Sequence, residues 1–193
     1  MPDQDERDDL VAPAKVHGKR PSAVLPNLNL CGDIGLKIAR DGTWYYQGGT
    51  IARKPLVKLF ASVLRLEEDG RYYLVTPVEK VSIEVEDLPF VAVEMRREGS
   101  GEAQRLSFVS NVDEVVMAGP EHPIGFQPGP EGGFTPFVVM RRGLRARLAR
   151  PVYYELAALA IDGPESQGPG VWSGGVFFPF RQVRCAALAA RSI

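Results

Sequence analysis

The residues best suited to acid–base or metal chemistry lie close together in one short stretch of the chain. Glu84 and Glu86 share one face of a predicted strand with Lys80, and Asp87 follows at the end of that strand. Paired carboxylates can transfer protons or bind a divalent metal ion through oxygen. Together with Asp113 they make up one hypothesis, a metal-assisted hydrolase. The alternative is a solvent-facing strand edge, whose charges discourage association with another edge.

A second group of reactive side chains is a cluster of arginines late in the chain. Five of them fall within ten residues: Arg141, Arg142, Arg145, Arg147 and Arg150. The planar guanidinium group suits phosphate and carboxylate partners, so the cluster is a candidate anion site. Residues 137–193 carry a net charge of +5 (eight arginines less three acids), which leaves −6 for residues 1–136. The alternative interpretation is a solvated strand face that pairs with the acids of the other half.

Two further side chains would complete a polar and aromatic pocket. Asn111 offers a hydrogen-bond donor and an acceptor, and Trp44 offers a stacking surface, although Trp44 also fits a half-buried position in the core. The predicted ligand-binding residues are therefore Trp44, Lys80, Glu84, Glu86, Asp87, Asn111, Arg142, Arg145 and Arg147. No catalytic residue, metal ligand or cofactor is assigned.

Familiar catalytic and cofactor motifs do not occur in the sequence. A phosphate-binding loop needs glycines followed by lysine and a hydroxyl, whereas residues 48–54 have these in another order. Zinc needs about four nitrogen or sulfur ligands. The chain has two histidines and two cysteines, without the spacing of such a cluster. Ser173, before two glycines, lacks the histidine and acid of a hydrolase triad. These observations favour a binding protein over an enzyme.

The composition is that of an ordinary globular protein. Hydrophobic residues make up 45% of the 193 residues and charged residues 24%, enough to bury a core. No apolar run approaches the ~18 residues that span a bilayer, and the acidic start is unlike a secretory signal. Cys31 and Cys185 are too few for a disulfide scaffold. We therefore expect a cytoplasmic protein that binds neither membranes nor nucleic acid, with no pattern that defines its oligomeric state.

The predicted elements are short curved strands with about one helix in each half, the pattern of an α+β fold. Asp41-Gly42 predicts a hairpin between strands at residues 31–40 and 43–47. A leading proline and apolar residues at helical spacing predict a helix at residues 55–64. Alternating apolar residues predict one strand from residue 137 to residue 148.

A second predicted helix, near residues 152–161, repeats the first one. Placing Pro151 on Pro55 aligns the two helices at an offset of 96 (151 − 55), about half of the chain. This repeat predicts two related lobes that arose by internal duplication, and interfaces between lobes are common ligand sites. The predicted division is a disordered acidic tail at residues 1–22, an N-terminal lobe at 23–96 and a C-terminal lobe at 97–193.

A series of segments together resembles a bacterial family known as domain of unknown function 1285. The segments are residues 41–45, 56–60, 73–80, 83–90, 110–114, 144–147, 153–156 and 173–178. The run from Thr76 to Phe90 is the most specific, and the resemblance covers nearly all of the chain beyond the tail. It implies a duplicated unit whose C-terminal part is superficially similar to pleckstrin-homology folds. It also implies a nucleotide-like ligand between the lobes and a role in bacterial signal transduction.

We therefore expect a non-enzymatic ligand-binding or sensor module. Its two lobes would hold a small anionic, nucleotide-like molecule, with arginines of the second lobe on the phosphates and Trp44 stacked on the base. The metal-assisted hydrolase that uses the carboxylates around Glu84 to Asp87 is the alternative.

Overall fold

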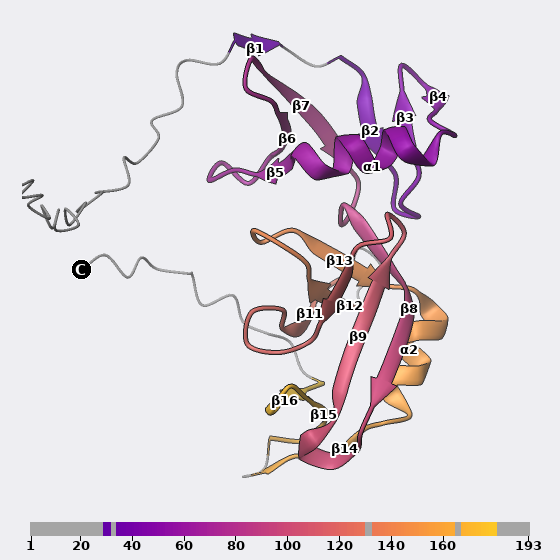
Figure 1. Cartoon of the computed structure of the whole chain (residues 1–193), viewed down its shortest axis with the longest axis vertical. Coiled ribbons are helices and arrows are strands. Elements are labelled where there is room, and N and C mark those ends of the chain that lie inside the picture. Colours follow the sequence, from indigo (N-terminus) through magenta and orange to yellow (C-terminus); the bar gives the residue numbers. More distant parts are fainter. Residues whose placement is uncertain (1–28, 32–33, 130–132, 165–166, 181–193) are drawn as a thin grey trace, which may run out of the picture.

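The protein consists of two lobes that lie one after the other along its long axis (Figure 1). The computed structural model describes residues 29–31, 34–129, 133–164 and 167–180. The tail predicted at residues 1–22 and Cys185 lie outside the described residues. A single cluster of buried apolar side chains runs through both lobes, from Leu36 in the first to Phe178 in the second. The lobes therefore share one hydrophobic core.

The first lobe is one sheet with a helix beside it. Its elements are β1 (Asn29–Cys31), β2 (Leu36–Ile38), β3 (Trp44–Tyr46), β4 (Gly49–Thr50), α1 (Lys54–Val63), β5 (Leu64–Leu66), β6 (Tyr72–Val75) and β7 (Glu79–Val85). The strands lie in the order β4-β3-β2-β7-β6-β5, and β1 also pairs with β7. β1 and β2 run parallel to β7, while the other neighbours are antiparallel. The predicted hairpin at Asp41-Gly42 and the predicted helix at residues 55–64 are confirmed.

The second lobe has a larger sheet, a helix and a small additional sheet. Its elements are β8 (Phe90–Glu98), a 3-10 turn (Gly101–Ala103), β9 (Arg105–Ser110), β10 (Val115–Met117), β11 (Ile124–Pro128), β12 (Phe134–Val139), β13 (Arg145–Leu148), α2 (Arg150–Ala157), β14 (Ile161–Asp162), β15 (Pro169–Ser173) and β16 (Val176–Pro179). The larger sheet has the order β10-β9-β8-β13-β12-β11, and β14-β15-β16 form the smaller one. The α+β fold of two strand-rich lobes is confirmed; the likeness to a pleckstrin-homology fold stays a prediction.

The two larger sheets repeat one topology, but their helices do not. In each of these sheets two three-stranded meanders meet where the first strand of one pairs in parallel with the last strand of the other, β2 with β7 and β8 with β13. Helix α1 connects the two meanders of the first lobe, whereas α2 follows the second meander of its lobe. The equivalent strands β2 and β8 begin 54 residues apart (90 − 36). The offset of 96 therefore aligned two helices that occupy different places in the repeat.

The single strand predicted at residues 137–148 is wrong, because a tight turn divides it into β12 and β13. Arg142 and Gly143 adopt φ angles of 49° and 77°, and the Met140 N–H donates to the Leu144 carbonyl at 2.8 Å. Positive φ at two successive residues is typical of hairpin turns that match the strand twist. Met140 and Leu144 are both fully buried, so the apolar alternation continues across the turn and hides it in the sequence.

The lobes divide between β7, which ends at Val85, and β8, which begins at Phe90. The boundary placed from the sequence between residues 96 and 97 thus falls inside β8, a strand of nine residues. Apolar strands occur on both sides of that point, so their pattern does not reveal which sheet each one joins.

The turn between β2 and β3 packs directly against the second lobe. Asn111 donates from Nδ2 to the Gly42 carbonyl at 3.2 Å, and its Oδ1 accepts from the Val91 N–H at 3.1 Å. The Asn111 N–H also donates to the Val91 carbonyl at 2.8 Å. Asn111 thereby holds the first lobe's hairpin turn against β8.

Gly42→Ala is expected to lower the free energy of unfolding by about 2–4 kcal/mol, the sum of backbone strain and overpacking. Gly42 has a φ of 86°, and an added Cβ would lie 2.6 Å from Asn111 Nδ2 and 3.0 Å from Val91 Cγ2. Gly48→Ala is the matched control, because Gly48 has a φ of 82° with nothing within 4 Å. It should lose only the backbone contribution of roughly 1 kcal/mol. Urea unfolding of both variants measures the difference, and equal losses would show that the turn does not pack tightly.

Candidate junction site

A buried carboxylate lies where the lobes meet. Only 9% of the Asp87 side chain is exposed, and its Oδ2 lies 3.9 Å from Arg40 Nε and 3.6 Å from Arg147 Nε. Gln127 Nε2 lies 3.5 Å from Asp87 Oδ1, at the limit of a hydrogen bond. Asp87 Oδ2 and Arg147 Nε are buried and have no hydrogen-bond partner within the described ranges. Asp87 therefore attracts one guanidinium group from each lobe without being fully hydrogen-bonded by either.

Backbone groups extend this contact between the lobes. Arg147 donates from a terminal guanidinium nitrogen to the Arg40 carbonyl at 2.8 Å, and the Arg40 N–H donates to Glu86 Oε2 at 2.9 Å. On the other side of Asp87, Arg145 donates to Gln127 Oε1 at 3.0 Å and lies over the Phe137 ring, 4.5 Å from its centroid. β13 thus brings both of its arginines to the junction, because Arg145 and Arg147 alternate with the buried Ala146 and Leu148.

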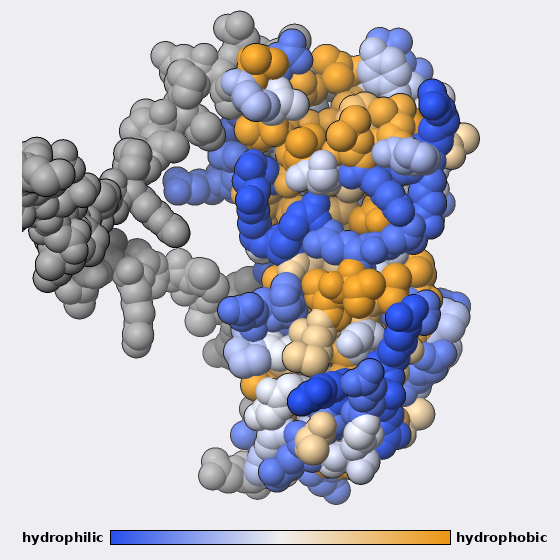
Figure 2. All heavy atoms as spheres, in the orientation of Figure 1, coloured by the Kyte–Doolittle hydropathy of each residue, from blue (hydrophilic) through white to orange (hydrophobic). Residues whose placement is uncertain are grey.

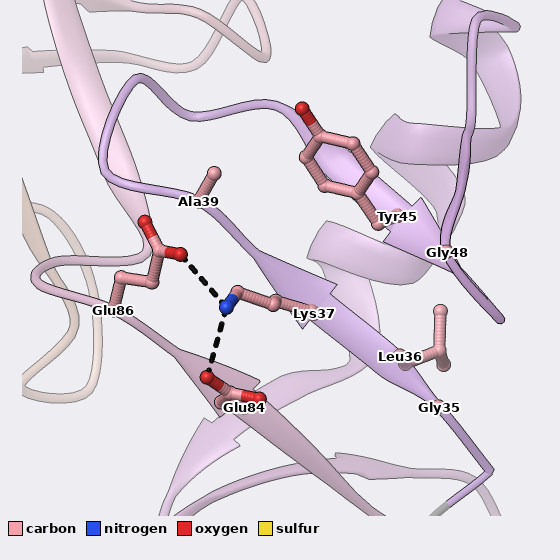
Figure 3. Close-up of a pocket in the computed structure, with 8 residues that line it drawn as sticks. All are labelled: Gly35, Leu36, Lys37, Ala39, Tyr45, Gly48, Glu84 and Glu86. Atoms are coloured by element: carbon pink, nitrogen blue, oxygen red, sulfur yellow. Dashed lines mark ion pairs between the residues drawn. The ribbon is translucent and has the colours of Figure 1, made fainter.

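Lys37 of β2 pairs with Glu84 of β7 and with Glu86, which directly follows β7. Its Nζ lies 2.8 Å from Glu86 Oε1 and 3.1 Å from Glu84 Oε1, as Figure 3 shows. Hydrogen bonds from Lys37 and from the Arg40 N–H hold the pKa of Glu86 below its ordinary value. The same two glutamates raise the pKa of Lys37. These three side chains and Tyr45 line a cavity of about 390 Å³ on the sheet. Its two carboxylates and one ammonium group make it a poor site for an anion.

A second cavity, of about 280 Å³, is lined by side chains of both lobes. Its polar lining contains Arg40 from the β2–β3 turn, Arg147 from β13, and Arg150, Tyr153 and Tyr154 from α2. The remaining lining residues are Phe134, Thr135, Pro136 and Leu148. We call this space the junction cavity. It combines three guanidinium groups with aromatic rings, a set of side chains that suits phosphate groups and a flat ring.

The junction cavity is electropositive even though Asp87 lies next to it. Asp87 offsets part of the charge of Arg40 and Arg147, while Arg150 forms no ion pair in the part of the chain that the structure describes. Arg150 is the first residue of α2, whose N-cap Ala149 makes no side-chain cap and whose first turn holds no acid. The positive end of the helix dipole therefore adds to the arginines.

Five of the nine predicted ligand-binding residues belong to this junction network. They are Glu84, Glu86, Asp87, Arg145 and Arg147. Arg147 alone among them lines the junction cavity. Glu84 and Glu86 pair with Lys37, and Glu86 also accepts from the Arg40 N–H. Asp87 and Arg145 both contact Gln127.

Two predicted residues are structural parts of the first lobe. Trp44 is only 1% exposed and stacks on Phe60 with the ring centroids 6.2 Å apart, so its ring faces the core and not a ligand at the junction. Lys80 lies over the Tyr73 ring, 4.1 Å from its centroid, and pairs with Glu67 at 3.4 Å.

Two others lie elsewhere in the second lobe. Asn111 is occupied by the Gly42 and Val91 backbones, and Arg142 is exposed at the tip of the β12–β13 turn. The preceding Arg141 donates to Glu114 and to the Ala61 carbonyl of α1. The arginine cluster therefore does not form one site. Arg141 contacts Glu114 and α1, Arg142 is exposed at the turn, and the other three arginines lie beyond the turn, near the junction.

Three of the four carboxylates of the hydrolase hypothesis pair with lysines, and Asp87 lies near two arginines. Asp113 lies 2.8 Å from Lys54 and also pairs with Lys58, both on α1, while Glu84 and Glu86 share Lys37. Hydrogen bonds from Lys54 and Lys58 lower the pKa of Asp113. In Figure 2, a band of hydrophilic side chains crosses the visible face of the molecule where the two lobes meet. The described residues contain no group of three or more histidine, cysteine, aspartate or glutamate side chains that could hold a metal ion.

Four residues line the junction cavity although the sequence did not predict them as binding residues: Arg40, Arg150, Tyr153 and Tyr154. Arg150 belonged to the recognised arginine cluster, and Arg40 directly precedes the predicted Asp41-Gly42 turn. The sequence does not reveal that this turn packs on the other lobe, so Arg40 could not be assigned. In the described part of the chain, no helix has the length and apolar character needed to cross a membrane.

Comparisons with families and solved structures agree on one relationship. The family model described as "Domain of unknown function (DUF1285), N-terminal domain" matches residues 25–88, and "Protein of unknown function (DUF1285), C-terminal domain" matches residues 89–180. The crystal structure of a DUF1285 family protein from Silicibacter pomeroyi DSS-3 is similar, with 45% identity and a TM-score of 0.75 over 86% of this chain and 90% of that chain. A DUF1285 family protein from Shewanella baltica OS155 has 28% identity and a TM-score of 0.50 over 63% of this chain and 88% of that chain. No curated protein matches.

Lys37→Met is expected to raise the pKa of Glu86 toward its ordinary value of 4.5, because Lys37 donates the hydrogen bond that lowers this pKa most. A carboxylate whose pKa is lowered by folding stabilises the folded state above about 4.5, and this contribution is lost as the pH falls through the lowered value. Carbon-13 NMR titration of the side-chain carboxyl groups measures the change. Asp113 is the internal control, because its pKa is lowered by Lys54 and Lys58 and not by Lys37, so the substitution should leave it unchanged. If the pKa of Glu86 did not change, or if the pKa of Asp113 shifted equally, Lys37 would not be the specific cause of the lowered pKa of Glu86.

Proposed function

The chain belongs to the DUF1285 family of proteins of unknown function, and we propose that it is a non-enzymatic module that binds a small anionic, nucleotide-like ligand between its two lobes. The observation that carries the proposal is the junction cavity, with Arg40 from one lobe and Arg147 and Arg150 from the other. Three guanidinium groups around one space favour a ligand with more than one negative charge.

The size and rim of the junction cavity support a division of roles within the ligand. Its volume of about 280 Å³ lies just below the usual range for small-molecule sites, so we assign only the phosphate groups to the cavity. Tyr154 and Phe134, each 64% exposed, flank it and offer rings for the base. An aromatic ring presents a flat apolar face on which a planar base can stack. In this arrangement Tyr154 takes the stacking role that the sequence suggested for Trp44.

The position of the cavity also supports a sensor role in bacterial signal transduction. A ligand that contacts arginines of both lobes binds best to one arrangement of the lobes and therefore favours that arrangement. The ion pairs between Asp87 and the two guanidinium groups lie beside the same cavity. Ligand phosphates would compete with Asp87 for these groups, which couples occupancy to the contact between the lobes.

Arg150→Gln is expected to weaken nucleotide binding by about tenfold or more, the effect of losing one charge-assisted hydrogen bond. In a thermal-shift experiment with millimolar ADP, GDP or pyrophosphate, the wild-type protein should be stabilised, because ligands of the native state raise its stability. Arg142→Gln is the matched control: it removes the same charge at an exposed turn that does not line the junction cavity.

Two results would count against the proposal. The first is that none of these compounds stabilises the wild-type protein at millimolar concentration. The second is that Arg142→Gln weakens binding as much as Arg150→Gln does, since a general effect of net charge would then explain the binding.

A further inference from the structure

Helix α1 buries its apolar side only in part. Leu56, Phe60 and Val63 recur at helical spacing, yet Ala61 is the one residue buried among the ten of α1. A surface helix of a globular protein normally buries its apolar stripe against a sheet or another helix. In this protein the stripe is only half-buried: Phe60 stacks on Trp44 of β3 and Val63 packs against the core, while an open space remains beside them.

The space between α1 and the sheet is an apolar cavity of about 460 Å³, larger than the junction cavity. Leu56, Phe60 and Val63 line one side of it, and side chains of the sheet line the other. The lining residues from the sheet and its adjoining segments are Ile34, Leu36, Tyr46, Ile51, Leu74, Thr76, Glu79 and Val81. Figure 2 shows hydrophobic side chains gathered over this part of the first lobe. The volume and the apolar lining match those of small-molecule sites.

The few polar groups of this cavity define the charge that an occupant can carry. Tyr46, Thr76 and Glu79 are the polar side chains that line it, and Glu79 forms no ion pair with any described residue. Glu79 is an exposed residue, and its backbone N–H donates to Thr76 Oγ1 at 3.0 Å. No lysine or arginine is among the described residues that line the cavity. An anionic head group would therefore meet a carboxylate and no cation.

We infer that this cavity is a second binding site, for an amphiphile with an apolar body and a hydrogen-bond-donating, non-anionic head. The apolar body contacts the stripe of α1, and an ammonium or hydroxyl group at the rim donates to Glu79. This chemistry is opposite to that of the junction cavity, and the inference does not depend on the function proposed for that site.

The test uses the full chain and displacement of the neutral dye Nile red by decylamine, decanol and decanoate, each below its micelle concentration. Decylamine and decanol should displace the dye, and decanoate should bind at least about threefold more weakly than decylamine, the scale of one exposed ion pair. Glu79→Lys should reverse the order of decylamine and decanoate. Glu68→Lys is its matched control, because Glu68 is an exposed acid of the same lobe that does not line the cavity.

A second pair of variants tests the apolar part of the site. Val63→Trp should fill the cavity and reduce dye binding at least about tenfold, since the ligand would lose most of its apolar contact. Leu59→Trp lies on the same helix, is 60% exposed in the wild type and does not line the cavity, so it should bind as the wild type does.

Three results would overturn the inference. One is that the wild-type chain binds neither the dye nor any of the three compounds, as expected if the chain itself covers the cavity. Another is that Glu79→Lys and Glu68→Lys change the order of binding equally. The third is a stable dimer that Val63→Trp converts to a monomer, which would assign this surface to a second copy of the chain.

Discussion

The arrangement of the two lobes depends on one buried negative charge. Removing a carboxylate from water costs several kcal/mol unless cations or hydrogen bonds compensate it. Asp87 is compensated by Arg40 of the first lobe and Arg147 of the second, neither within hydrogen-bond distance of it. If either arginine were lost while the lobes stayed together, the charge of Asp87 would remain buried with less compensation. The same two arginines line the cavity in which we place an anion, so structural and ligand-binding roles meet at one pair of side chains.

Local patterns in the sequence predicted individual helices and hairpins better than they predicted which elements pair or pack together. The Asp41-Gly42 hairpin and the helix after Pro55 depend on neighbouring residues, and both form as expected. The turn at Arg142-Gly143 was missed because buried residues flank it on both sides. The 96-residue offset failed for a related reason: two helices that begin with proline look alike in sequence, whereas their places among the strands are a property of the whole sheet.

The candidate site was predictable in its chemistry and only partly in its members. Charge asymmetry between the halves indicated that acidic and basic groups would meet at the junction, and Asp87 and Arg147 do so. Arg40 enters the site because its turn packs on Asn111 and Val91, contacts that no local pattern encodes. Trp44 is buried on Phe60, since an aromatic residue on the core face of a strand contributes more by packing than by remaining accessible.

The parallel pairing of β2 with β7 and of β8 with β13 has a consequence for how the chain folds. β2 can pair with β7 only after the residues between Ile38 and Glu79 have closed into a loop, and β8 must wait in the same way for β13. Closing such loops costs entropy before any contact repays it, and sheets dominated by distant pairings fold slowly. During synthesis on the ribosome, β8 emerges before its partner β13 has been translated. The pairing at the middle of each large sheet is therefore completed last, after its outer hairpins can already have formed.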